Sequence, residues 1–165
     1  MDVKKNHLRT REISLIGVVA ALYVAITLLI APMAYGQLQL RLSEGFNHLA
    51  VFNKRYIWAL SIGVLIANMF SPLGIIDVIF GTLGTLVMTT ISYFLTRKMK
   101  SVVKRLIVST VIDTLMMWSV AVELYFVAKA PFWLTYGWVA LGELVSLIFG
   151  AVLIYVLSKR MDLSK

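Results

Sequence analysis

Long apolar runs alternate with short polar ones along this chain, and the pattern predicts helices that cross a membrane. The first run begins at Ile13 and continues to Pro32, which is long enough to span a bilayer as a helix. The pattern predicts six helices in all, at approximately residues 13–33, 44–53, 56–70, 75–96, 103–127 and 133–158. The second is too short to span alone. We therefore expect an all-α integral membrane protein, a six-transmembrane-helix bundle in which residues 1–165 form a single membrane domain.

One polar stretch, YGQLQLRLSEGFNHLAVFN at residues 35–53, interrupts this pattern without the usual turn residues. From Gln37 to Ser43, polar residues alternate with leucines, and this period of two predicts an extended ribbon with one wet and one apolar face. Arg41 and Glu44 then place opposite charges beside apolar helices. We interpret the stretch as a ligand-covering loop between helices 1 and 2. The alternative is a plain connection neutralised by an Arg41–Glu44 pair.

Composition supports the membrane assignment, because the chain is 60% hydrophobic with a mean hydropathy of +0.87. It contains no cysteine, which excludes disulfides, thiolate nucleophiles and Cys-ligated metals. The net charge is +8, and all lysines and arginines except Arg41 and Lys129 fall on one side if both termini are cytoplasmic. We expect a multi-pass protein of the cell membrane with both termini cytoplasmic. The positive charge then reflects topology and anionic lipid, and it indicates no nucleic-acid partner.

Acidic residues within the apolar segments are the strongest candidates for a binding site, because a carboxylate at bilayer depth is costly unless it is paired, hydrated or protonated. We expect a polar pocket in the outer half of the bundle, under the loop. The two plainer alternatives are that Asp77 only complements the positive end of its helix and that Glu123 only pairs with Lys129. The candidate acids are Glu44, Asp77, Asp113, Glu123 and Glu143.

Three further polar or aromatic residues are candidates for contact with a planar ligand. Asn68 offers a donor and an acceptor for the edge of a heterocycle, or it ties the following turn to the backbone. Trp118 and Trp138 either stack on a ring or pack against lipid and core. His7 and His48 lie on separate elements, so no metal site is expected.

Small residues recur every four positions in the first helix, at Gly17, Ala21 and Ala25. Such a stripe lets another helix approach closely, either a partner subunit or a helix of the same bundle. The chain has no G-x-x-x-x-G-K-[ST] phosphate-binding loop, so it cannot harvest ATP by itself. It also lacks an H-E-x-x-H helix or a Ser, His and Asp constellation typical of a hydrolase.

The order of these features resembles the QueT family of substrate-binding S components of energy-coupling factor (ECF) transporters. The most specific pieces are QLRLSE at residues 39–44 and ANMFSPLGIIDVIFGTL at residues 67–83, followed by LGEL in the last helix. The resemblance covers nearly the whole chain. The pair Ala21-x-x-x-Ala25 also resembles the motif by which S components dock on their transmembrane coupling subunit.

The resemblance implies a non-enzymatic subunit that captures a queuosine precursor, a 7-deazaguanine such as 7-aminomethyl-7-deazaguanine. It implies an ECF transmembrane coupling subunit and two ATPase subunits as partners, with ATP used by the ATPases and no cofactor in this chain. A carboxylate would accept the two adjacent N–H groups of the ring edge, and another would hold the aminomethyl cation. The candidates for these two tasks are Glu44, Asp77, Glu123 and Glu143. Gln39 or Asn68 would read the ring carbonyl, and Arg41 would pair with Glu44 to hold the loop shut.

Three other readings remain open at this point. An S component for a different vitamin or micronutrient would keep the fold but use other pocket residues. A small integral-membrane enzyme would need two catalytic groups at one depth, and Asp113 and Glu143 are the only such pair. A structural membrane subunit would need none of these acids.

Overall fold

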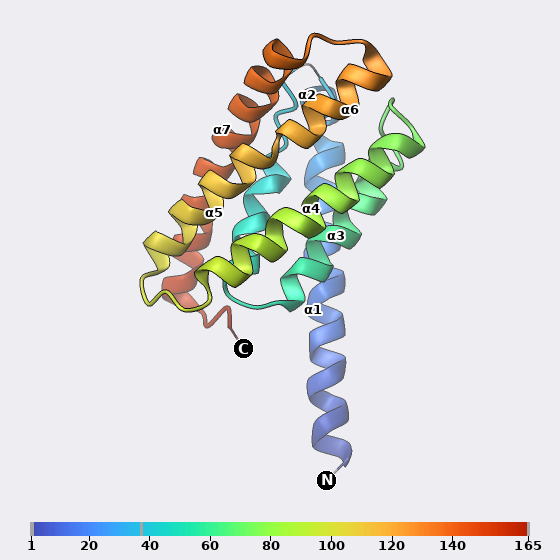
Figure 1. The fold of residues 1–165 in the computed structure, drawn as a ribbon. Helices are drawn as coiled ribbons and strands as arrows, with labels where there is room; N and C mark the ends of the chain where they lie inside the picture. The colour runs from blue at the N-terminus through green and yellow to red at the C-terminus, as the bar shows by residue number, and fades with distance from the viewer. Residues whose placement is uncertain (1, 37, 165) are drawn as a thin grey trace.

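The computed structural model describes residues 2–36 and 38–164, with side chains from Thr10 onward, and all of its regular structure is helical. Seven α-helices and one 3-10 helix fill these ranges (Figure 1). The elements are α1 (Asp2–Leu29), α2 (Ala31–Ala34), the 3-10 helix η1 (Leu42–Val51), α3 (Arg55–Asn68), α4 (Ile75–Thr96), α5 (Val102–Met116), α6 (Trp118–Ala128) and α7 (Phe132–Arg160).

Among the described residues, 4 segments are long and apolar enough to cross a membrane. They are Thr10–Leu29, Ile75–Thr96, Val102–Ala128 and Phe132–Arg160, and α3 is a shorter apolar helix. Large apolar side chains cover the outside of the bundle, as at Leu29 and Trp133, which are 83% and 79% exposed. An apolar exterior of this kind suits lipid as the surrounding solvent, so the prediction of a multi-pass helical membrane protein is confirmed.

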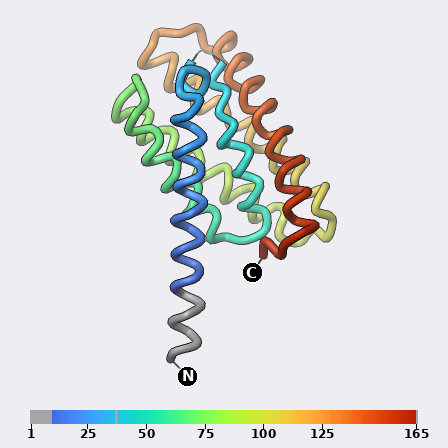
Figure 2. Tube along the Cα trace, turned by 180° about the vertical axis from the view of Figure 1, so that it is seen from behind, coloured from blue at the N-terminus to red at the C-terminus, as the bar shows by residue number. Residues whose placement is uncertain are grey.

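The short helix η1 lies in the middle of the bundle, where it packs against α1, α3, α4, α5 and α7. Figure 2 shows it between α1 and α7. The backbones of η1 and α7 touch at Gly45 and Gly150, where a side chain on either residue would collide with the other. A second close approach joins α1 to α3, because Gly63 lies against the Tyr23 ring. Glycine at these crossings lets helices approach to backbone contact.

The loop between α2 and η1 differs from the predicted extended ribbon. Gln37 lies outside the described residues, and from Leu42 onward the chain is already helical. The predicted alternation of polar and apolar faces is present, but the polar side chains are buried and the apolar side chain between them is exposed. Arg41 is 7% exposed and Ser43 fully buried, whereas Leu42 is 41% exposed. The polar face therefore points into the protein and the apolar face points outward, as expected when lipid surrounds the molecule.

Two predicted helices are each divided in the structure. The first ends at Leu29 rather than at residue 33, and α2 carries Pro32 in its first turn. Proline has no N–H and its ring clashes with the carbonyl four residues earlier, so it begins a new helix. The predicted helix at residues 103–127 is interrupted at Met117, between α5 and α6. The short predicted helix at residues 44–53 is the 3-10 helix η1, and the remaining three predicted helices match α3, α4 and α7 closely.

Candidate functional site

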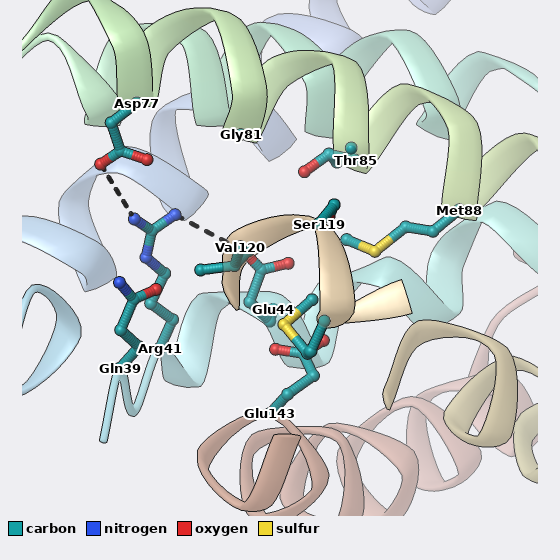
Figure 3. A pocket seen from close by; sticks show the side chains of 12 residues that line it. Gln39, Arg41, Glu44, Asp77, Gly81, Thr85, Met88, Ser119, Val120 and Glu143 are labelled. Atoms are coloured by element: carbon teal, nitrogen blue, oxygen red, sulfur yellow. Dashed lines mark ion pairs between the residues drawn. The ribbon is translucent and has the colours of Figure 1, made fainter. Parts of the chain in front are cut away.

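A polar cavity lies beneath the loop, between α4, α6 and α7 (Figure 3). It encloses about 460 Å³ of empty space including its mouth, although the centre of a water molecule reaches only about 30 Å³ of it. The site is therefore narrow and partly filled by its own side chains. It is lined by Gln39, Arg41, Glu44, Asp77, Gly81, Gly84, Thr85, Met88, Met117, Ser119, Val120 and Glu143.

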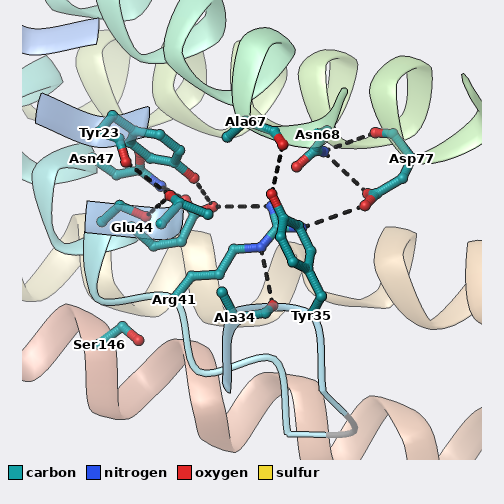
Figure 4. Close-up of polar contacts among 12 residues, drawn as sticks. Tyr23, Ala34, Tyr35, Arg41, Glu44, Asn47, Ala67, Asn68, Asp77 and Ser146 are labelled. Carbon is teal, nitrogen blue, oxygen red and sulfur yellow. Dashed lines mark hydrogen bonds and ion pairs between the residues drawn. The ribbon is translucent and has the colours of Figure 1, made fainter. Parts of the chain in front are cut away.

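Arg41 is a buried cation that lines this cavity. Its guanidinium lies 3.5 Å from Asp77 Oδ2 and 3.8 Å from Glu44 Oε1 (Figure 4). The Arg41 Nε–H donates to the carbonyl of Ala34 at 3.4 Å, and the guanidinium lies over the Tyr35 ring at 5.2 Å. Burial by itself would lower the pKa of Arg41, but the acidic neighbours outweigh burial and the pKa is raised above its ordinary value. Arg41 therefore remains charged.

Glu44 is fixed by donors from two other positions in the bundle. The hydroxyl of Tyr23, on α1, donates to Glu44 Oε1, and the side-chain amide of Asn47 donates to Glu44 Oε2 at 2.6 Å. Nearby, the hydroxyls of Thr27 and Ser43 lie 2.6 Å apart. All of these side chains are buried. The predicted Arg41–Glu44 pair is present, and α1 supplies much of the support for it.

Asp77 is held by the end of α3. The Asn68 amide donates to the Asp77 backbone carbonyl at 2.9 Å and to Asp77 Oδ1 at 3.1 Å. Asp77 Oδ2 has no hydrogen-bond partner among the described residues and lies 3.5 Å from the Arg41 guanidinium. Gly81 makes the contact possible, because a side chain at this position would strike the Asn68 amide. Asn68 thus orients Asp77 and does not itself line the cavity.

Two buried acids next to Arg41 have carboxylate oxygens without partners. Glu143 lines the cavity at 2% exposure, and its Oε1 has no hydrogen-bond partner among the described residues. Glu123 is 1% exposed on α6, both of its carboxylate oxygens lack partners, and it interacts electrostatically with Asp77 and Arg41. Buried polar atoms normally find partners. These oxygens are therefore available to a ligand that brings hydrogen-bond donors.

A family model described as "QueT transporter" matches residues 13–159. The chain belongs to the QueT transporter family. It is 40% identical to the "Queuosine precursor transporter QueT" of Lactococcus lactis subsp. cremoris (strain MG1363), over 95% of this chain and 98% of that protein. No solved structure matches the chain. A QueT transporter acts on a small molecule at a membrane and is not an enzyme, so the enzymatic reading of Asp113 and Glu143 is set aside.

In this QueT transporter, Asp113 belongs to a second polar cluster. Its carboxylate accepts hydrogen bonds from Ser92 at 3.0 Å and from Ser109 at 3.3 Å. The Ser109 hydroxyl also lies 3.3 Å from His48 Nδ1, and the opposite ring nitrogen contacts the carbonyl of Leu147 at 3.0 Å. These bonds join α4, α5, η1 and α7. Unlike Glu123 and Glu143, Asp113 is therefore satisfied by the protein itself.

The structure does not bring every predicted residue to the cavity. Trp118 is 50% exposed and Trp138 is 42% exposed, and neither lines it. The stripe formed by Gly17, Ala21 and Ala25 lies on the exposed side of α1. A side chain at Gly17 would meet nothing within 4 Å. The stripe thus remains available to a partner and is not used within this bundle.

Several residues that shape the site were not predicted. Tyr23 and Asn47 hold Glu44, and Met117 and Val120 line the cavity beside the break between α5 and α6. Tyr23 carried a signal, because it is four residues from Thr27 and so shares a polar face within an apolar helix. Asn47 follows Glu44 by three positions, within reach on one helical face. Met117 and Val120 carried no signal, since apolar residues line many helix contacts.

Proposed function

We propose that this chain is the substrate-capturing S component of an ATP-driven ECF importer for a queuosine precursor, a 7-deazaguanine such as 7-aminomethyl-7-deazaguanine. The name of the 40% identical relative supports the substrate class. The observation that carries the chemical argument is the set of buried carboxylate oxygens without partners beside the cavity, at Glu123 and Glu143.

The charge of the site favours a cationic substrate. Among the described residues, Arg41 is the only cation that lines the cavity, and it faces the acids Glu44, Asp77 and Glu143, with Glu123 close by. Carboxylates buried without compensation are destabilising, and a bound cation offsets part of this cost. The aminomethyl group of the substrate is an ammonium at neutral pH. We assign Glu123 and Glu143 to this group.

The membrane arrangement follows the distribution of charge. In the proposal α3 and η1 also lie within the bilayer, so that six segments cross or enter it and the loop covers the site from outside. Lysines and arginines other than Arg41 and Lys129 then face the cytoplasm together with both termini. The arrangement of α1 and α7 is compatible, because α1 begins and α7 ends at the same end of the bundle (Figure 1).

In this proposal energy comes from partner subunits, and the lack of a phosphate-binding loop in this chain is consistent with it. We propose that a transmembrane coupling subunit binds the exposed stripe of Gly17, Ala21 and Ala25, and that two ATPases drive it. The three stripe positions carry no side chain larger than a methyl group, which supports close helix packing with such a partner.

The proposal is tested by thermal unfolding of the detergent-purified protein with 7-aminomethyl-7-deazaguanine. A ligand that binds the folded state raises the melting temperature by mass action. The 7-cyano analogue, guanine and thiamin are the comparison ligands. We expect the largest shift with the aminomethyl compound, because only it brings an ammonium group. Glu143→Gln and Glu123→Gln should each weaken binding by about 10- to 100-fold, as expected for loss of a charge-assisted hydrogen bond.

The matched control is Glu12→Gln, which makes the same chemical change on the exposed part of α1. It should bind like the unaltered protein. A flat response to every deazaguanine would refute the substrate assignment, and stabilisation by thiamin alone would favour an S component for another micronutrient. Unchanged affinity in both glutamine variants would refute the roles of Glu123 and Glu143.

A further inference from the structure

Two carboxylates of the cavity form a place for a planar cation. Asp77 and Glu44 come from different elements, α4 and η1, and their oxygens approach the Arg41 guanidinium from two sides (Figure 4). We call this pair of carboxylates the Asp77–Glu44 seat. Arg41 reaches it from the loop, whereas the seat itself belongs to the helical bundle.

The seat is built independently of Arg41. Tyr23 and Asn47 hold the Glu44 carboxylate, and Asn68 holds Asp77 through Oδ1. None of these three donors lies in the loop. The remaining oxygen, Asp77 Oδ2, is buried and has no hydrogen-bond partner among the described residues. The carboxylates should therefore keep their positions when Arg41 leaves.

Arg41 occupies the seat loosely. Charge-assisted N–H···O bonds are typically about 2.7–2.9 Å long. The distances from Arg41 to Asp77 and Glu44 are 3.5 and 3.8 Å, which gives Coulomb attraction without close hydrogen bonds. The loop that presents Arg41 also holds Gln39 at a φ of 47°, a left-handed conformation that is unfavourable for a residue other than glycine. A ligand that donates two well-placed N–H groups can displace it.

We propose that the guanidinium of Arg41 is a built-in stand-in for the substrate, and that the substrate binds by displacing it from the Asp77–Glu44 seat. The inference rests on the proposed function. The ring edge of a 7-deazaguanine, an N–H beside an amino group on the same carbon, has the shape and donor pattern of half a guanidinium. The seat receives this edge, while Glu123 and Glu143 receive the ammonium.

This exchange also predicts selection of the aminomethyl compound. Arg41 takes one positive charge out of the seat, and the aminomethyl compound brings one positive charge into the site. The total charge among the buried acids is therefore conserved. The 7-cyano analogue presents the same ring edge without a charge, so its binding leaves the acids less compensated. Selectivity thus follows from the exchange together with the contact of the 7-aminomethyl ammonium with Glu123 and Glu143.

The decisive experiment uses Arg41→Ala and a small guanidinium. The thermal unfolding of this variant is followed with 0 to a few millimolar methylguanidinium chloride, with methylammonium chloride at equal ionic strength as the comparison. We expect saturable stabilisation by methylguanidinium, because it refills the seat, and no such effect on the unaltered protein. Asp77→Asn in the Arg41→Ala background should abolish the rescue.

Arg55→Ala is the matched control. It removes another buried arginine, whose guanidinium donates to the Leu163 carbonyl, and it should show no rescue.

Substrate binding gives the second readout. Arg41→Ala should bind 7-aminomethyl-7-deazaguanine at least as tightly as the unaltered protein, on the order of tenfold tighter, because the competing occupied state is gone. Methylguanidinium should compete with the substrate in this variant. Weaker substrate binding by Arg41→Ala would show that Arg41 is a ligand for the substrate and would overturn the proposal. If Arg41→Ala does not fold, Arg41→Gln keeps a polar stem without the charge, and the same outcomes apply.

The two proposals fail in different ways. Rescue of Arg41→Ala by methylguanidinium, with no deazaguanine binding to any form, would retain the seat and refute the substrate. Deazaguanine binding by the unaltered protein, with no rescue of the variant, would retain the proposed function and refute the stand-in.

Discussion

The crossing of η1 and α7 depends on two single residues, Gly45 and Gly150. A Cβ atom at Gly150 would lie 2.5 Å from the Gly45 carbonyl oxygen and 2.6 Å from its carbonyl carbon. Since both neighbours are backbone atoms, neither can rotate away. We predict that Gly150→Ala lowers the stability by about 1–3 kcal/mol or more, the range for overpacking, measured as a lower melting temperature.

Gly137→Ala is the matched control for this change, because it lies on the same helix and its Cβ would meet nothing within 4 Å. Alanine is a better helix former than glycine, so this variant should be as stable as the unaltered protein or slightly more stable. Equal melting temperatures for the two variants would contradict the close crossing.

At the residue scale, the sequence located the candidate acids within the apolar helices but did not indicate their partners. A carboxylate in an apolar helix is visible as a cost that must be offset, which identified Asp77, Glu123 and Glu143 without a structure. Which acid is satisfied internally depends on contacts between distant segments. Asp113 is satisfied by serines on α4 and α5, and nothing local in the sequence indicates this.

At the element scale, the loop over the cavity rests directly on α7. A Cβ atom at Gly142 would collide with the carbonyl oxygen of Leu38 and would lie 3.1 Å from its carbonyl carbon. We predict that Gly142→Ala displaces the loop from α7 and leaves the helical bundle folded. Dissociation of the bound substrate should then be faster, on the order of tenfold, because the loop no longer covers the site. Stopped-flow displacement measures this rate.

Gly137→Ala again provides the control, as an exposed alanine substitution on α7 whose Cβ would meet nothing within 4 Å. If Gly142→Ala releases substrate at the unaltered rate with the same melting temperature, the loop does not act as a cover. A large loss of stability instead would mean that the contact of Leu38 with α7 is part of the fold.

The elements themselves were predictable where they are long and regular, as in α4 and α7. The predictions that failed concern short segments. The period of two between Gln37 and Ser43 identified two faces, but alternation cannot distinguish a ribbon from a loop that leads into a 3-10 helix. The break at Met117 contains neither glycine nor proline, and it places Met117, Ser119 and Val120 against the cavity. Local propensity does not indicate a break at this position.

At the scale of the whole molecule, the proposed substrate site and the proposed coupling surface lie on different parts of the protein. The cavity lies inside the bundle, under the loop, whereas the stripe of Gly17, Ala21 and Ala25 is exposed on α1. On the same helix, Tyr23 and Thr27 are fully buried and face the Glu44 region. Helix α1 therefore contributes to the site on one side and presents the stripe on another.

This division predicts that the two activities can be separated by mutation. Replacing Ala21 with Leu puts a bulky side chain on the face proposed to pack against the coupling subunit, where close approach requires small residues. Uptake of labelled substrate by cells containing the ATPases and coupling subunit should fall to background, and co-purification of the coupling subunit should be lost. The melting temperature and substrate affinity of the isolated protein should stay unchanged, since Ala21 is exposed.

Val18→Leu, an exposed substitution that replaces one large apolar side chain with another, is the control and should transport normally. Normal uptake by Ala21→Leu would place the coupling surface elsewhere, whereas loss of substrate binding would show that α1 transmits the change to Tyr23 and Glu44.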